Sequence, residues 1–195
     1  MERFEPKLDH KDPKKELHFN AEKCECLIPV ENVSIPQKVS DAAMRHDLEI
    51  KPEFHVTVLA GANGRRVNKM LSESVEGSAL REKIRLIFEK KSWDYKPTNE
   101  YFLISKFYSK EELGEMGFPD TPEHTKTTII QKMILNELEE FYKELSKITG
   151  LEFIVPYPHI TLFTTASYEP WKSKGIGVYS EDELASYLQE KIDIN

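Results

Sequence analysis

The sequence of 195 residues lacks any long hydrophobic run. Its apolar stretches are a handful of residues at most, such as Ile134–Leu135 and Phe153–Pro156, and these are too short to span a bilayer. The first residues, Met1–Pro6, alternate charges and contain no apolar signal region. We therefore expect no membrane partner.

Cysteine is scarce as well. Cys24 and Cys26, the two cysteines of the chain, are separated by one residue and would share a face of a strand. They do not form the disulfide framework typical of small secreted proteins. The chain also lacks the His-Glu-x-x-His and Cys-x-x-Cys spacings of common metal sites, which disfavours a metalloenzyme. We expect a cytoplasmic protein with no cofactor and no metal.

An excess of positive charge is also missing. The chain has 27 lysines and arginines against 34 aspartates and glutamates, a net charge of -7. Binding of duplex nucleic acid requires many cations, so this balance argues against it. A small nucleotide or a short oligonucleotide needs only a few local cations and remains compatible with the composition. We expect a monomer with such a substrate.

What is present is ordinary globular composition, with 39% hydrophobic and 31% charged residues. The length allows one substantial domain, or one built from two similar halves. Residues 1–23 mix both charge signs with two prolines and show no period, which predicts an N-terminal extension. It is a solvated tail or, alternatively, a lid over a site. Residues 24–195 are expected to form a single bilobal domain.

The hydrophobic pattern predicts alternating strands and helices. Strands are expected at 26–30, 53–60, 101–108, 152–155 and 159–163, and helices after Ser34, at 78–91, at 127–149 before Gly150, and from Ser180 with Glu183 in a capping box. The tetrapeptide Gly61–Gly64 is typical of a turn that ends a strand. Because strand–helix–strand material occurs twice, the order indicates an α+β fold with two related lobes.

One short motif occurs twice in matching strands. His55-Val56-Thr57-Val58 and His159-Ile160-Thr161-Leu162 both read His, apolar, Thr, apolar. Side chains alternate along a strand, so each His shares a face with its Thr while the apolar residues point into a core. None of the other four histidines has a Thr two places later. A single copy is weak, because a lone His in a strand is usually structural, but two copies predict a shared cleft.

Such a cleft contains the groups for phosphoryl transfer. Two imidazoles supply a base and an acid near neutral pH. Two threonine hydroxyls supply hydrogen bonds to the non-bridging phosphate oxygens. In an in-line displacement one His would deprotonate the nucleophile and the other would protonate the leaving oxygen, with no need for a metal.

These residues resemble the 2H phosphoesterase superfamily, named for two His-x-Thr/Ser motifs, which includes 2′,3′-cyclic phosphodiesterases and 2′-5′ RNA ligases. Pro158–Leu162 is the more typical copy, and the resemblance spans roughly Glu25 to Phe163. It implies a bilobal duplicated fold in which two antiparallel sheets face a central groove, with helices outside. It also implies metal-independent hydrolysis of 2′,3′-cyclic or 2′-5′-linked phosphodiesters.

The same resemblance implies a catalytic set, which comprises His55, Thr57, His159 and Thr161. By similarity, His159 activates water and His55 is the acid. The N-terminal extension and the long segment between the motifs depart from the simplest members, so the substrate stays open. Substrates within the superfamily include RNA ends, 2′-5′ oligoadenylates, small cyclic phosphates and cyclic oligonucleotide signals.

Five further residues are candidates for substrate binding: Tyr157, Arg65, Arg66, Trp171 and Lys174. Tyr157 shares a strand face with His159 and either stacks on a base or forms a packed wall. The arginines follow the first motif strand and either hold a phosphate or lie exposed. The segment from Trp171 to Gly177 contains a Gly-x-Gly whose amides either cradle a phosphate or form a plain loop.

Two other functions compete with a phosphodiesterase of small nucleotides. One is hydrolysis of cyclic oligonucleotide signals by the same residues. The other is a nucleotide- or RNA-end-binding module with little turnover, against which two intact motifs count. A purely structural interaction protein explains neither motif.

Overall fold

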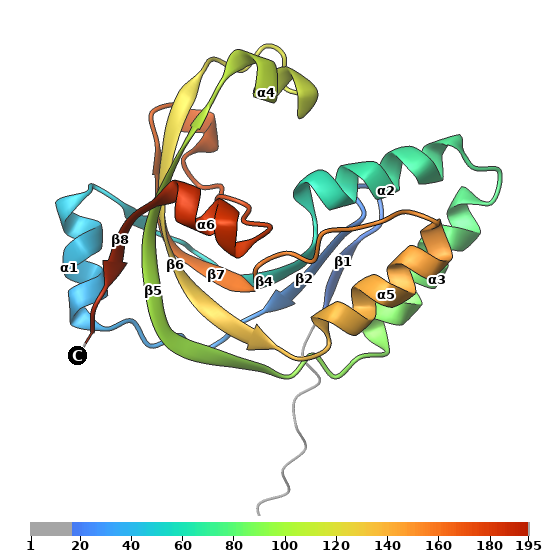
Figure 1. The fold of residues 1–195 in the computed structure, drawn as a ribbon, viewed down its shortest axis with the longest axis horizontal. Helices are drawn as coiled ribbons and strands as arrows, with labels where there is room; N and C mark the ends of the chain where they lie inside the picture. The colour runs from blue at the N-terminus through green and yellow to red at the C-terminus, as the bar shows by residue number, and fades with distance from the viewer. Residues whose placement is uncertain (1–16, 195) are drawn as a thin grey trace, which may run out of the picture.

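The computed structural model describes residues 17–194, which form a mixed α+β fold (Figure 1). The strands are β1 (His18–Asn20), β2 (Glu25–Pro29), β3 (Glu49–Ile50), β4 (His55–Leu59), β5 (Tyr95–Tyr108), β6 (His124–Leu135), β7 (His159–Ala166) and β8 (Leu188–Ile192). The helices are α1 (Gln37–Arg45), α2 (Gly61–Glu73), α3 (Gly77–Glu89), α4 (Lys110–Glu115), α5 (Leu138–Thr149) and α6 (Glu181–Tyr187), with a 3-10 turn at Glu169–Trp171. None of these helices is long and apolar enough to cross a membrane.

Antiparallel pairing joins all eight strands into one curved sheet (Figure 1). The strand order is β1-β2-β4-β7-β6-β5-β8, and β3 pairs with β7 beside this path. The α+β class and the antiparallel strands are therefore confirmed. The hydrogen bonds do not divide the strands into the two sheets that the resemblance implies.

Alternation along the strands builds an apolar cluster on each face of this sheet. In β5, Tyr101 and Leu103 enter the larger cluster, whereas Phe102 and Ile104 enter the smaller one. Helices α1, α2, α3 and α5 supply the larger cluster with buried residues, which are Val39, Ala42, Ala43, Val67, Leu71, Ile84, Phe88, Leu138, Phe141, Tyr142 and Leu145. Helix α6 covers the smaller cluster through Leu184. Both faces of β5 and β6 are thereby packed.

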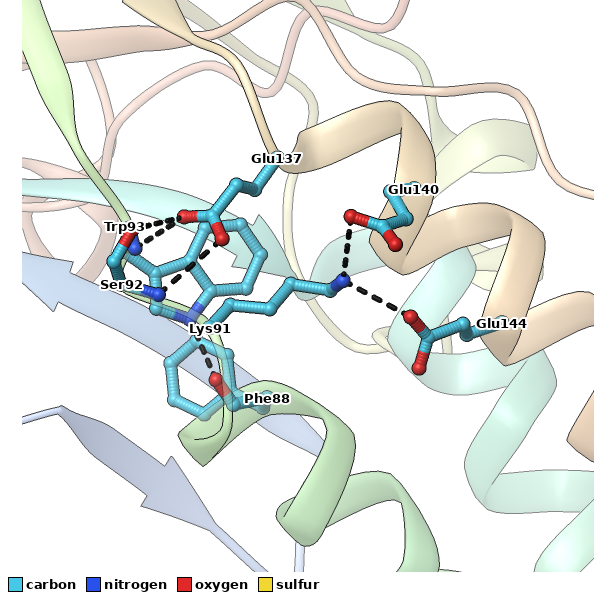
Figure 2. A network of polar contacts seen from close by, with 7 residues as sticks. All are labelled: Phe88, Lys91, Ser92, Trp93, Glu137, Glu140 and Glu144. Atoms are coloured by element: carbon cyan, nitrogen blue, oxygen red, sulfur yellow. Dashed lines mark hydrogen bonds and ion pairs between the residues drawn. The ribbon is translucent and has the colours of Figure 1, made fainter.

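A polar network fixes the turn between α3 and β5 against the start of α5 (Figure 2). The Glu137 carboxylate accepts hydrogen bonds from the backbone N–H groups of Ser92 and Trp93. The indole N–H of buried Trp93 donates to the carbonyl of Phe88 at 2.6 Å. Lys91 pairs with two carboxylates of α5, at 3.2 and 3.0 Å from Glu140 and Glu144. The network ties the end of α3 and the turn after it to α5.

Several predicted elements are confirmed, one is correct over half its length and two are wrong. The helix expected at 127–149 is a strand, β6, followed by the shorter α5, because β6 pairs with β5 on one side and β7 on the other. The turn expected at Gly61–Gly64 opens α2, and Glu152–Val155 contains no strand.

The expected N-terminal extension contains a piece of the sheet. Strand β1 lies within residues 1–23 and pairs with β2 from His18 to Asn20. Residues 1–16 are outside the described residues, so the alternatives of a tail or a lid stay predictions for that part.

Candidate active site

The two His-x-Thr motifs line one cavity of about 300 Å³. They lie on neighbouring strands, β4 and β7, which pair antiparallel with Val56 opposite Ile160. This register sets His55 across from Thr161, and Thr57 across from His159. Val56 and Ile160 are buried in the larger apolar cluster on the other face. The alternation predicted from the sequence thus directs the polar side chains of both motifs to the same side.

His159 is oriented by the backbone two residues before it. Its Nδ1 lies 2.8 Å from the carbonyl oxygen of Tyr157, and because that oxygen can only accept, Nδ1 carries the proton. In the neutral ring Nε2 is therefore the basic nitrogen. Burial lowers the pKa of His159, while the backbone groups of Tyr157 and Ile176 act in the opposite direction.

His55 lies in a similar environment without such an anchor. Burial lowers the pKa of its imidazole, and the positive charge of Lys51 lowers it further, against the opposing effect of Glu53. The histidines are close enough for His159 to add to the same effect. Within residues 17–194 the side chains of His55, Thr57 and Thr161 have no hydrogen-bond partner, so their polar groups are free to bind a ligand.

A segment after β7 passes directly over the second motif. A Cβ added at Gly175 would lie 2.6 Å from Thr161 Oγ1, which places the backbone of this segment against the Thr hydroxyl. Farther on, the Tyr179 hydroxyl accepts a hydrogen bond from the backbone N–H of Ala62 at 2.9 Å. Gly61 has a φ of +54°, and a Cβ there would clash with the Tyr179 hydroxyl. The segment is thus docked on the start of α2 as well as on Thr161.

The structure brings some of the predicted binding residues to this cavity and not others. Tyr157 and Lys174 line it. Arg65 and Arg66 are exposed on α2 and do not line it, and the Arg66 guanidinium lies over the ring of Phe153 instead. Trp171 is buried in a separate aromatic cluster with Tyr108 and does not line the cavity either. The sequence alone does not show that α2 turns away from the motif strand.

The sequence analysis did not identify several of the lining residues, among them Lys51, Tyr142 and Tyr179. Lys51 precedes His55 by four residues, and its Nζ donates to the carbonyl of Ser173 at 2.6 Å. The Tyr142 hydroxyl donates to the carbonyl of Val58 at 2.8 Å and joins α5 to the first motif strand. Only the position of Lys51 beside the first motif offered a signal in the sequence.

The acidic residues of the cavity are Glu25 and Glu53. Over the described range no three His, Cys, Asp or Glu side chains gather in a way that could hold a metal ion. Comparison of the chain with family models, curated proteins and solved structures finds no match. The chemistry of the cavity is therefore the basis for a function.

Proposed function

We propose that this protein is a metal-independent phosphodiesterase that hydrolyses 2′,3′-cyclic or 2′-5′-linked phosphodiester bonds in small nucleotides or oligonucleotides. The observation that carries the proposal is the arrangement of His55, Thr57, His159 and Thr161 around one cavity. Two imidazoles and two hydroxyls meet the demands of in-line displacement at phosphorus. The resemblance to 2H phosphoesterases leads to the same reaction.

In this reaction the two histidines have different tasks. His159 takes a proton from water through Nε2, and the water oxygen attacks phosphorus. The bond from phosphorus to the leaving ribose oxygen breaks, and protonated His55 gives its proton to that oxygen. Thr57 and Thr161 donate hydrogen bonds to the non-bridging oxygens, where negative charge increases in the transition state.

The lowered pKa values of the two histidines are compatible with their roles as acid and base once substrate is bound. In the empty cavity burial favours the neutral form of both rings. An anionic phosphodiester next to His55 favours its protonated form, since an opposite charge raises the pKa of a histidine. The anchored Nδ1–H of His159 keeps its Nε2 available as the base. Substrate binding is therefore accompanied by uptake of a proton.

We also propose that the sheet consists of two lobes that meet at the motif strands. The pairing between β4 and β7 consists of the single pair Val56 and Ile160, whereas β5 and β6 pair along most of their length. The weakest connection in the sheet thus lies between the two motifs. A groove between two lobes is consistent with this position of the cavity.

The test is a substrate panel analysed by chromatography with chelator present. It contains 2′,3′-cyclic mononucleotides, 2′-5′ oligoadenylate, and 3′-5′-linked cyclic di- and trinucleotides. Replacing His55 or His159 by asparagine should lower kcat by roughly 10²–10⁴-fold with the fold intact. The matched control is His46→Asn, because His46 is exposed at the end of α1.

Each result of the panel has a consequence. Cleavage of cyclic di- or trinucleotides alone would identify the substrate as a cyclic oligonucleotide signal. Tight binding without product would indicate a binding module. Activity that survives in both single histidine variants, or that chelator abolishes, would refute the proposed mechanism.

A further inference from the structure

Three lysines lie at one end of the cavity, around the segment that follows β7. Lys51 Nζ donates to the carbonyl of Ser173, and Lys126 Nζ donates to the carbonyl of Trp171 at 2.7 Å. Lys174 belongs to the same segment, and its Nζ lies 4.2 Å from the centre of the Trp171 ring. Lys51 and Lys174 line the cavity, while Lys126 is fully buried beside Trp171.

None of the three forms an ion pair with a carboxylate anywhere in the described part of the chain. Other lysines do, as Lys106 shows with Glu112 at 2.7 Å. Glu53 faces the cavity and favours the charged form of Lys51, but burial has the larger effect and lowers its pKa. Glu53 is the one carboxylate whose charge acts on the pKa of these three described lysines.

Burial disfavours the charged form of these lysines to different degrees, since Lys126 is fully buried and Lys51 half-buried while Lys174 is exposed. It lowers the pKa of Lys174 and brings that of Lys126 to about 7, with a further contribution from the charges of Lys174 and Lys51. A desolvated cation without an anion destabilises a protein and a bound anion relieves that cost, which applies to half-buried Lys51 more than to exposed Lys174. The Lys51 ammonium has three donors and gives one to Ser173, which leaves donors for a ligand.

We propose that Lys51 and Lys174 form a subsite for a second phosphate group of the substrate, next to the two His-x-Thr motifs. The inference rests on the proposed function and defines its substrate class. The substrate carries at least one phosphate besides the diester that is cleaved, as a 5′-phosphorylated nucleotide or an oligonucleotide does. A 2′,3′-cyclic nucleoside without such a group fills only part of the cavity.

The experiment compares kcat/KM for adenosine 2′,3′-cyclic phosphate with two substrates that carry a second phosphate. One is its 5′-phosphorylated form, and the other is the diadenosine that ends in a 2′,3′-cyclic phosphate. The wild type should prefer at least one of these, and Lys51→Met or Lys174→Met should reduce that preference roughly tenfold. The ratio cancels any effect of Lys51 on His55. Lys83→Met is the control, because Lys83 is exposed on α3.

Two outcomes would overturn the subsite without refuting the proposed hydrolysis. In the first, the wild type shows no preference for either substrate with two phosphates. In the second, the lysine variants slow all substrates equally. If the methionine variants do not fold, as judged by circular dichroism, Lys51→Arg and Lys51→Gln replace them. The arginine variant should then keep the preference and the glutamine variant should lose it, and equal behaviour of the two overturns the subsite.

Failure of the proposed function is distinguished by a binding measurement. If the wild type cleaves none of the three substrates, calorimetric titration with inorganic pyrophosphate tests the subsite alone. Affinity that falls in Lys51→Met and Lys174→Met, but not in Lys83→Met, supports it. Absent binding, or equal affinity in all four proteins, overturns it.

Discussion

The imidazole of His55 lies where its neutral form is favoured, and Lys51 is one cause. Burial has the largest effect on its pKa and the Lys51 charge the next. Replacing Lys51 by methionine removes a nearby positive charge and should raise the pKa of His55 toward the ordinary value of 6.5. Titration of the imidazole protons by NMR measures this shift. An unchanged His55 titration in Lys51→Met, or an equal shift in Lys83→Met, would contradict the placement of Lys51.

Lys126 makes the stability of the protein depend on pH. Its pKa is 10.5 in the unfolded chain and about 7 in the fold. As pH falls through this window the unfolded lysine takes up a proton that the folded one resists, so the free energy of unfolding decreases. At neutral pH this decrease is about 4 kcal/mol. At pH values above this window the lysine is neutral in both states, so the free energy of unfolding is not decreased.

Lys126→Met should therefore be more stable than the wild type at neutral pH and lose that advantage in alkaline buffer. The carbonyl of Trp171 loses its donor in this variant, which offsets part of the gain. Urea unfolding at about pH 7 and about pH 10 measures the difference. Lys83→Met provides the comparison, and a stability difference that does not vary with pH would show that the buried lysine is not the cause.

At the scale of elements, the segment from Gly175 to Tyr179 contributes to the site through its backbone. Gly175→Ala would press a methyl group against Thr161 Oγ1 and displace one of the two hydroxyls. We expect kcat/KM to fall by roughly 10-fold or more with little loss of stability, because misplaced catalytic groups lose rate steeply. Gly114→Ala is the matched control, since nothing lies within 4 Å of a Cβ there. Equal activity of both variants would contradict the close contact.

The helix caps show how local patterns succeed. Ser180 begins α6 as predicted, and its hydroxyl accepts from the N–H of Glu183 at 3.0 Å. The Glu183 carboxylate accepts from the N–H of Tyr179, one residue before the expected partner. Gly150 ends α5 in the left-handed conformation. Caps are set by residues three or four places apart, so the sequence contains the whole interaction.

Strand β6 shows how such patterns fail. Its apolar residues also match a helical period, yet Thr127, Thr128, Ile129 and Ile130 are β-branched and favour a strand. Whether this segment forms a helix or a strand depends on residues distant in the sequence, because β6 pairs with β5 on one edge and β7 on the other. Helix α2 was not predicted for a related reason. Its residues Asn63 and Gly64 are buried by tertiary packing, which the local sequence pattern does not contain.

At the scale of the whole molecule, the two free cysteines report global unfolding. Cys24 and Cys26 are fully buried in the larger apolar cluster, and burial raises the pKa of both thiols. Since the thiolate is the reactive form, a thiol reagent should label neither residue until the fold opens. The labelling rate should rise with denaturant in parallel with unfolding followed by circular dichroism. Rapid labelling of the native protein would contradict the burial of this core.

The sequence by itself determined the pairing of polar and apolar residues in the two motifs. Alternation along a strand fixes which side chains share a face, so His55, Thr57, His159 and Thr161 were identifiable without a structure. Only the tertiary structure decided what joins them. Pairing of Val56 with Ile160 and the return of residues 174–179 over the motif strands bring Lys51, Tyr179 and Lys174 to the same cavity. Those contacts link residues far apart in the chain, and their free energy comes from long-range strand pairing and burial that no local pattern encodes.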